Sequence, residues 1–134
     1  MVDDDIEKLF EKGIKVRREV LGEAHVDRSL KNSDAFSRPI QDLVTAFAWG
    51  GVWSRPGLPR QTRSMLNLAM LAALGKEDEL GHHVRGALTN GVSKEEIAEV
   101  LVQVAIYAGF PAALSAFRVA RNVIAEVEKG ASSK

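Results

Sequence analysis

Apolar side chains recur every three or four residues along almost the whole chain, which is the spacing of amphipathic helices and not of strands. The first such run includes Ile6, Leu9 and Ile14 and follows three aspartates, which favour a helix N-terminus. Leu21-Gly22 is expected to end it. No segment has the alternating pattern of a half-buried strand, so the sequence predicts an all-α fold.

The same periodicity predicts about five more helices. The polar segment 23–34 is expected to be a connector, and segment 50–59, with three glycines and two prolines, is expected to be a loop. Ser93 and Glu96 have the spacing of a capping box, serine at the cap and glutamate three positions later. The small polar tail 129–134 is expected to fray. The helices are expected at residues 37–49 (with Ser37 as cap and Pro39 in the first turn), 60–74, 76–89, 94–109 and 111–128.

The helix at 60–74 is apolar on nearly every side, which predicts that it is the buried central helix. One small domain has few helices with which to cover it, so packing against another copy of the chain is expected. The sequence therefore predicts a homo-oligomer. The buried stripe of the last helix is expected to contain Leu114, Phe117, Ala120, Ile124 and Val127.

Length and composition limit the class of protein. The 134 residues are expected to form one compact domain spanning 1–134, and 18 basic against 18 acidic residues give no cationic surface for nucleic acid. The longest apolar stretches are too short to span a membrane, and the acidic start is unlike a signal peptide. A soluble cytoplasmic protein is expected. Because there is no cysteine, disulfides, thiolate metal sites and thiol nucleophiles are excluded.

Two adjacent histidines offer the clearest chemistry. In helical projection, His83 lies at the margin of the apolar stripe and Glu79 lies one turn before it, whereas His82 points toward solvent. A carboxylate at that distance can orient the imidazole of a general acid or base. The alternative is that His83 is a core-edge histidine without a catalytic task.

Metal and cofactor sites are not expected. His82 and His83 are neighbours and cannot share one helix face, and His25 is alone in its segment. The glycines of segment 50–59 match no phosphate-binding loop. The sequence therefore predicts neither a zinc site nor a phosphate-binding loop.

Segment 49–58 combines aromatic rings with a restrained cation. Trp49 and Trp53 flank a glycine pair, and Arg55 is followed by Pro56. A guanidinium binds a carboxylate through two parallel hydrogen bonds, so Arg55 is a candidate carboxylate anchor. Arg28 and Arg63 could serve the same purpose. The alternatives are that the tryptophans fill the core and that each arginine is a solvated surface residue.

Several short segments that are characteristic of one protein family are distributed over nearly the full length of the chain. They include Val16-Arg17-Arg18, Ala24-His25-Val26-Asp27-Arg28-Ser29, Ala48-Trp49-Gly50, Arg55-Pro56-Gly57-Leu58-Pro59-Arg60, Thr62-Arg63-Ser64, His83 with Arg85, Asn90-Gly91-Val92 and Pro111-Ala112-Ala113. In these segments the chain resembles the carboxymuconolactone decarboxylase family.

The resemblance implies an all-helical fold of the alkylhydroperoxidase D type, assembled as a homo-oligomer, often a hexamer built as a trimer of dimers. It also implies cofactor-free decarboxylation of a small anionic lactone, 4-carboxymuconolactone, in the protocatechuate branch of the 3-oxoadipate pathway. Redox relatives carry a Cys-x-x-Cys pair, which would fall on Lys76 and Glu79 here. Thiol peroxidase activity is therefore excluded.

The implied reaction assigns expected roles. His83 is the expected general acid, with Glu79 as its orienting partner, and His25 is a weaker contender for the acid. Arg55 is expected to anchor one carboxylate of the substrate, and the pocket walls are expected to be aromatic. Two alternatives stay open: a related enzyme acting on another small acid, and a non-catalytic helical module. The further candidates are Arg28, Arg63 and Arg85 as carboxylate ligands, and Trp49 and Trp53 as walls that exclude water.

Overall fold

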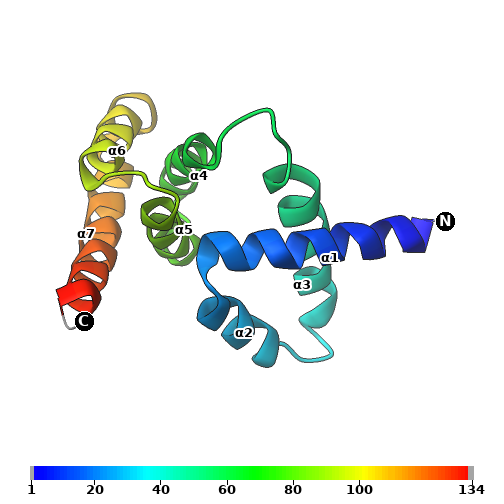
Figure 1. The fold of residues 1–134 in the computed structure, drawn as a ribbon. Coiled ribbons are helices and arrows are strands. Elements are labelled where there is room, and N and C mark those ends of the chain that lie inside the picture. Colours follow the sequence, from blue (N-terminus) through cyan, green and yellow to red (C-terminus); the bar gives the residue numbers. More distant parts are fainter. Residues whose placement is uncertain (1, 133–134) are drawn as a thin grey trace. The chain divides into compact units, whose positions relative to one another are not determined.

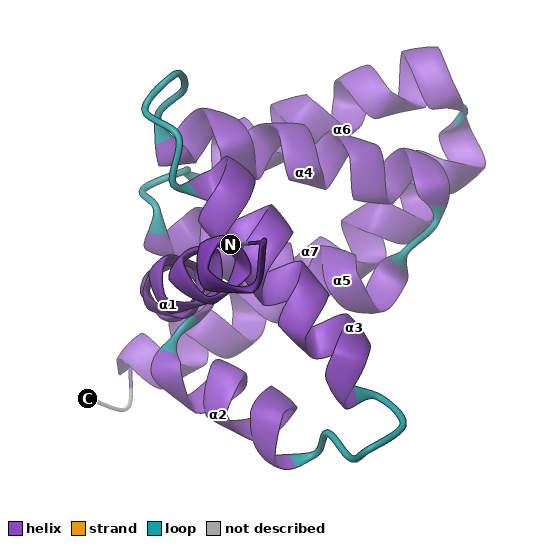
Figure 2. Ribbon diagram, turned by 90° about the vertical axis from the view of Figure 1, so that its right-hand side faces the viewer, coloured by secondary structure: helices purple, strands orange, loops and turns teal. Residues whose placement is uncertain are grey.

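The computed structural model describes the backbone of residues 2–132, and within that range every regular element is a helix (Figures 1 and 2). The all-α class predicted from the periodicity is therefore confirmed. The described residues contain seven α-helices and one π-helix, against the six or so helices expected. The chain divides into two compact units, residues 1–59 and 60–134.

The first unit is built around a long helix that packs against the π-helix. A shorter helix follows the long one and packs back on it, and another leads directly into the π-helix (Figure 1). In chain order these are α1 (Val2–Leu21), α2 (Glu23–Lys31), α3 (Arg38–Leu43) and η1 (Val44–Trp53).

Two glycines let α1 and η1 approach backbone to backbone. A Cβ on Gly13 would overlap the carbonyl oxygen of Thr45 and would lie 2.8 Å from the amide nitrogen of Gly50. A Cβ on Gly50 would likewise overlap the carbonyl oxygen of Leu9. Only a residue without a side chain fits at either position, because the opposing atoms are main-chain atoms that cannot rotate away.

The expectation that residues 23–34 form a connector is wrong over Glu23–Lys31, which is α2. Gly22, at φ 92°, lets the chain turn directly from α1 into a new helix. Val26 and Leu30 are one turn apart and pack into the core of the first unit. Glu23 at the start and Lys31 at the end also suit the helix dipole.

The expectation of a loop at 50–59 is wrong over 50–53, since η1 continues to Trp53, and is confirmed over 54–59. Gly50 and Gly51 are helical here, and Gly50 is needed for the contact with α1. Ser37 does precede α3, and Pro39 lies in its first turn as predicted. The side chain of Ser37 does not cap the helix, however, because its hydroxyl is bonded to Asp34.

The second unit consists of four helices whose limits agree with the predicted ones to within about two residues, except at the C-terminus. The last helix continues to Ser132, so the expected fraying of 129–132 is wrong, while 133–134 lie outside the described residues. An ion pair of 3.2 Å between Lys94 and Glu128 ties this region to the neighbouring helix. The helices are α4 (Arg60–Leu74), α5 (Glu77–Thr89), α6 (Lys94–Ala108) and α7 (Phe110–Ser132).

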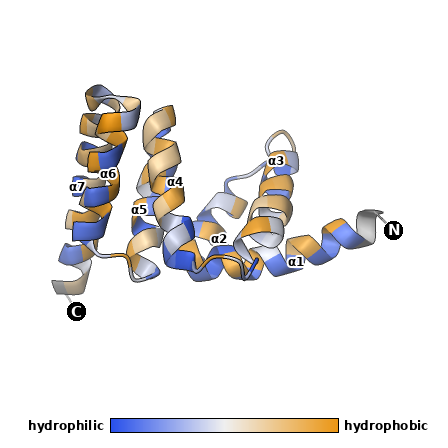
Figure 3. Ribbon diagram, turned by 90° about the horizontal axis from the view of Figure 1, so that it is seen from above, coloured by the Kyte–Doolittle hydropathy of each residue, from blue (hydrophilic) through white to orange (hydrophobic). Residues whose placement is uncertain are grey.

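The expectation that α4 is buried all round is wrong for the single chain. Its neighbours α5, α6 and α7 cover the face that carries Leu68 and Ala72, whereas Met70 is 53% exposed. Figure 3 shows α4 largely in the orange of hydrophobic residues. The expected burial of Leu114 on α7 is also wrong. Leu114 is exposed, and the buried stripe of α7 passes through the smaller Ala113 and Ala116. Small residues there let α7 pack closely against α5 and α6.

The capping box predicted for α6 is present. The Ser93 hydroxyl accepts the amide N–H of Glu96 at 3.1 Å, and the Glu96 carboxylate accepts the amide N–H of Ser93 at 3.0 Å. We expect Ser93→Ala to lower the free energy of unfolding by about 1 kcal/mol, measured by urea denaturation. Ser93→Asp keeps an acceptor at the cap and should remain close to wild type. Equal losses in the two variants would contradict this role.

Candidate functional site

Helix α5 carries the two central histidines. It starts with three acidic residues, which favour a helix N-terminus, and it ends at Asn90 before Gly91, whose φ of 89° turns the chain away. Leu80, Val84 and Ala87 are buried and fix the rotation of the helix about its axis. The positions of the histidines follow from this rotation.

The two histidines differ in environment as the helical projection predicts: His82 is exposed and His83 is half-buried. The ring nitrogen Nδ1 of His83 lies 3.4 Å from the side-chain nitrogen of Asn67 on α4. If that amide N–H donates, Nδ1 is the acceptor and the ring proton is on Nε2. Asn67 is therefore a contact of the histidine that sequence reasoning missed.

A second polar pair crosses from α5 to α4 in the same region. The side-chain amide of Asn90 donates to the hydroxyl of Ser64 at 2.9 Å, and Ser64 is fully buried. Arg63, half-buried, lies one turn before Asn67 and so shares its side of α4. The contact between α4 and α5 thus places polar groups, including a titratable imidazole, in a mostly apolar core.

The other two candidates on α5 are directed toward solvent. Glu79 is exposed, and the structure shows no hydrogen bond between it and the described residues. Arg85 is exposed, and it pairs with Glu126 of α7 at 2.8 Å. The contact that the structure does show at Nδ1 of His83 comes from Asn67 and not from Glu79.

In the first unit, Trp49 and Trp53 are stacked, with ring centroids 4.9 Å apart and planes inclined by 27°. They are only 4% and 7% exposed and pack with Val16, Val20 and Val26. Both rings thus belong to the core of this unit, which was one of the two readings of the sequence.

The remaining candidates of the first unit are more accessible. Arg55 is exposed in the segment after η1, where its amide N–H donates to the carbonyl of Val52 at 3.0 Å. On α2, His25 is half-buried and Arg28 is exposed. The structure therefore leaves the exposed Arg28 guanidinium able to meet an anionic ligand.

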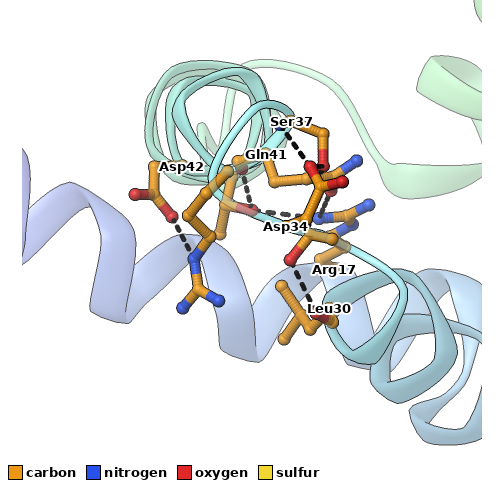
Figure 4. Close-up of polar contacts among 9 residues, drawn as sticks. Arg17, Leu30, Asp34, Ser37, Gln41 and Asp42 are labelled. Carbon is orange, nitrogen blue, oxygen red and sulfur yellow. Dashed lines mark hydrogen bonds and ion pairs between the residues drawn. The ribbon is translucent and has the colours of Figure 1, made fainter.

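The most unusual charged group is Arg17 on α1, which the sequence analysis did not single out. Its side chain is buried, with 6% of the residue exposed, and Nη1 donates to Thr45 Oγ1 at 3.0 Å and to Gln41 Oε1 at 3.2 Å (Figure 4). Burial lowers the pKa of the Arg17 guanidinium from its ordinary value. Asp34, drawn in the same view, accepts instead from the amides of Ser37 and Phe36, and the Ser37 bonds lower its pKa.

One signal for Arg17 is present in the sequence. Gly13, Val16, Arg17 and Val20 have the i, i+3, i+4, i+7 spacing of one helix face, and all four are buried. A cation on the buried face of an amphipathic helix is uncommon and points to a special environment.

Other kinds of site find no support among the described residues. No group of three or more histidine or acidic side chains there is arranged to hold a metal ion. Of the helices described, none is long and apolar enough to cross a membrane.

Comparison with known protein families identifies one match. The sequence profile described as the carboxymuconolactone decarboxylase family matches residues 38–122, more than half of the chain and parts of both units. The chain belongs to the carboxymuconolactone decarboxylase family. The matched range includes His83, Asn67, Arg55 and Arg63, whereas Arg17 and His25 lie before it.

Individual proteins are also similar to this chain. A 4-carboxymuconolactone decarboxylase of Acinetobacter baylyi is 48% identical over 121 residues, 90% of each chain. Nitrosuccinic acid decarboxylase npaB of Metarhizium robertsii is 45% identical over 124 residues, 92% of this chain and 87% of the relative. An uncharacterized 15.0 kDa protein of Paracoccus denitrificans is 35% identical over 83 residues, 60% of this chain and 62% of its own.

Proposed function

We propose that this protein is a decarboxylase of 4-carboxymuconolactone that works without a cofactor. The observation that carries the proposal is the 48% identity over 90% of both chains to a protein named for that reaction. The absence of cysteine is in keeping with it, because a dithiol peroxidase reaction has no residue to perform it.

The proposed substrate supplies its own electron sink. Loss of carbon dioxide from the ring carbon leaves an electron pair that passes through the ring double bond into the lactone carbonyl. The protein then has three tasks: it binds the carboxylates, stabilises the developing enolate oxygen and delivers a proton to carbon. Arginine, hydrogen-bond donors and a protonated imidazole suit these tasks in that order.

The proposed roles follow this division. His83 is the general acid, and its half-buried ring next to Asn67 supports that role because a partner at Nδ1 can fix the tautomer. Glu79 remains the second proposed orienting group, and His25 the alternative proton donor. The proposed carboxylate ligands are Arg55, Arg28, Arg63 and Arg85, and the proposed aromatic walls are Trp49 and Trp53.

The experiment that tests the function is a direct assay. Purified protein is supplied with enzymatically generated 4-carboxymuconolactone, and carbon dioxide release and enol-lactone formation are followed together. Equal amounts of both products are expected. No turnover by folded protein would show that this reaction is not its function.

A second substrate has one observation in its favour, the 45% identity to a relative named as a nitrosuccinic acid decarboxylase. The same acid–base groups could serve, because one fold and one site type support several reactions. Nitrosuccinic acid assayed beside the lactone distinguishes the two, since the specificity constant kcat/KM should favour the true substrate by orders of magnitude.

We also propose that the chain acts as one domain in a cytoplasmic homo-oligomer, with the hexamer as the size that the family resemblance implies. The family profile spans residues of both units, which supports one functional domain. In the single chain, α4 and α6 line an apolar groove of about 490 Å³ that includes Leu66, Met70 and Tyr107. An exposed apolar groove of this kind is typical of a contact between subunits.

Light scattering coupled to gel filtration is expected to give a mass that is a multiple of 14.6 kDa. Met70→Glu places a charge in the groove and should reduce that mass. The matched control is Glu95→Lys on the solvent side of α6, which should leave the mass unchanged. A monomer in the wild type would contradict the proposed assembly.

A further inference from the structure

Arg17 has a pair of hydrogen-bond donors that the protein does not use. Both of its hydrogen bonds in the described structure come from Nη1, to Thr45 and Gln41. Its Nε is fully buried and has no acceptor, as is also the case for Nε of Arg18 and of Arg63. Nη2 forms no hydrogen bond there either, although it is not fully buried.

Arg17 lacks a negatively charged partner as well as acceptors for these donors. Two other arginines of the first unit have carboxylate partners: Arg18 pairs with Asp27 at 2.9 Å and Arg38 with Asp42 at 3.3 Å. Arg17 is the buried one and has two neutral partners. A buried cation without a counter-ion is costly, because it has left water and gained no opposite charge. A costly group of this kind persists in a protein where it serves a function, such as the binding of an anion that supplies the missing charge.

We propose that the Nε–Nη2 edge of Arg17 binds the carboxylate of a small organic acid. Two parallel N–H donors on one edge of a planar guanidinium match the two oxygens of a carboxylate. Nη2 is where the anion arrives, and the second oxygen reaches Nε only when the groups that cover Nε in the unliganded protein move aside. The ligand class is a carboxylate and not a cation or a neutral molecule.

The neighbours of Arg17 hold this edge in place before any ligand arrives. The Thr45 hydroxyl donates to the carbonyl of Gln41 at 2.7 Å, which leaves its oxygen facing Arg17 Nη1. The Gln41 side-chain oxygen binds the same nitrogen, so the guanidinium plane is fixed from two sides. Because the cation is already oriented, little conformational entropy is lost when the anion binds.

The inference extends the proposed function by adding a carboxylate ligand, but it does not depend on decarboxylation. Its test measures the binding of an unreactive probe, succinate, with the neutral isostere succinamide as control and with constant ionic strength. A failed decarboxylation assay would leave the binding result intact, and the reverse also holds.

The first experiment uses the unaltered protein. Arginine side-chain Nε–H resonances are followed by ¹H–¹⁵N NMR during titration with succinate, and Arg17 is assigned by its disappearance in Arg17→Lys. We expect the Arg17 resonance to shift saturably with succinate and not with succinamide. An Arg17 resonance that does not move at saturating succinate would overturn the proposal.

The second experiment uses neighbouring arginines as a matched pair. Succinate should raise the thermal midpoint of the wild type and of Arg18→Met, because Arg18 is half-buried and already paired with Asp27. Arg17→Met should lose this response, and Arg17→Lys, which keeps the charge but not the fork, should bind succinate at least about tenfold more weakly. An unchanged affinity in Arg17→Lys, or an equal response in both methionine variants, would contradict the site. The lysine variant decides the matter if Arg17→Met does not fold.

Discussion

Replacing His83 by alanine is expected to lower the turnover number for 4-carboxymuconolactone by roughly 10²- to 10⁴-fold, the usual contribution of a positioned general acid. The reason is that the electron pair left by carbon dioxide needs a proton at carbon, and water is a poor substitute for an oriented imidazolium. Because His83 is only half-buried, its removal should not unfold α5. The measurement is steady-state kinetics, with helicity and oligomer mass recorded for the same samples.

The adjacent histidine provides the control. His82 is exposed and points away from the buried face of α5 that carries Leu80, so His82→Ala should keep wild-type kinetics. Asn67→Ala removes the contact at Nδ1 and should reduce the turnover number less than the loss of the imidazole itself. A fully active His83→Ala would move the proton donor elsewhere, and His25→Ala would then be the next variant to measure. Equal losses in the two histidine variants would indicate damage to α5 and not loss of an acid.

The helices of the second unit were predictable because each signal was local. The limits of α4, α5 and α6 follow from glycine, from the Ser93 capping box and from stripes with a period near 3.6 residues. Segment 23–31 has two apolar side chains that face the core, too few for a pattern, so α2 depends on its contact with α1. The last residues of η1 were missed because Gly50 and Gly51 indicated a loop, although Gly50 is needed for close packing against α1.

Those features of the candidate site that depend only on the direction of a side chain about one helix axis could be predicted from the sequence. The difference between His82 and His83 follows from 100° per residue once Leu80 and Val84 are recognised as core. Asn67 could not be found in this way, because its contact with His83 depends on how α4 packs against α5. In the sequence, Arg17 and Arg18 look like two adjacent surface arginines. Only the position of Arg17 on the same helix face as Gly13, Val16 and Val20 indicates that it is the buried one.

The largest stability effect is expected at the contact of α1 with η1. Gly50→Ala places a methyl group where the carbonyl oxygen of Leu9 already lies. The two helices must move apart, which also separates Arg17 from Thr45 and disturbs the stacked Trp49 and Trp53. We expect a loss of at least about 3 kcal/mol in the free energy of unfolding, since main-chain atoms cannot rotate away from the clash. Urea denaturation followed by tryptophan fluorescence measures it.

Gly51, the neighbouring glycine of the same helix, provides a matched control. At Gly51 the nearest atom to an added Cβ is the Ala46 carbonyl oxygen at 3.8 Å, an ordinary contact, and φ there is not positive. Gly51→Ala should therefore be neutral or stabilising by up to about 1 kcal/mol, because alanine has less conformational freedom to lose on folding. A midpoint for Gly50→Ala equal to that of Gly51→Ala would show that α1 and η1 are not in backbone contact in solution. In that case the Arg17–Thr45 bond, which depends on the same approach, could not hold the guanidinium as described.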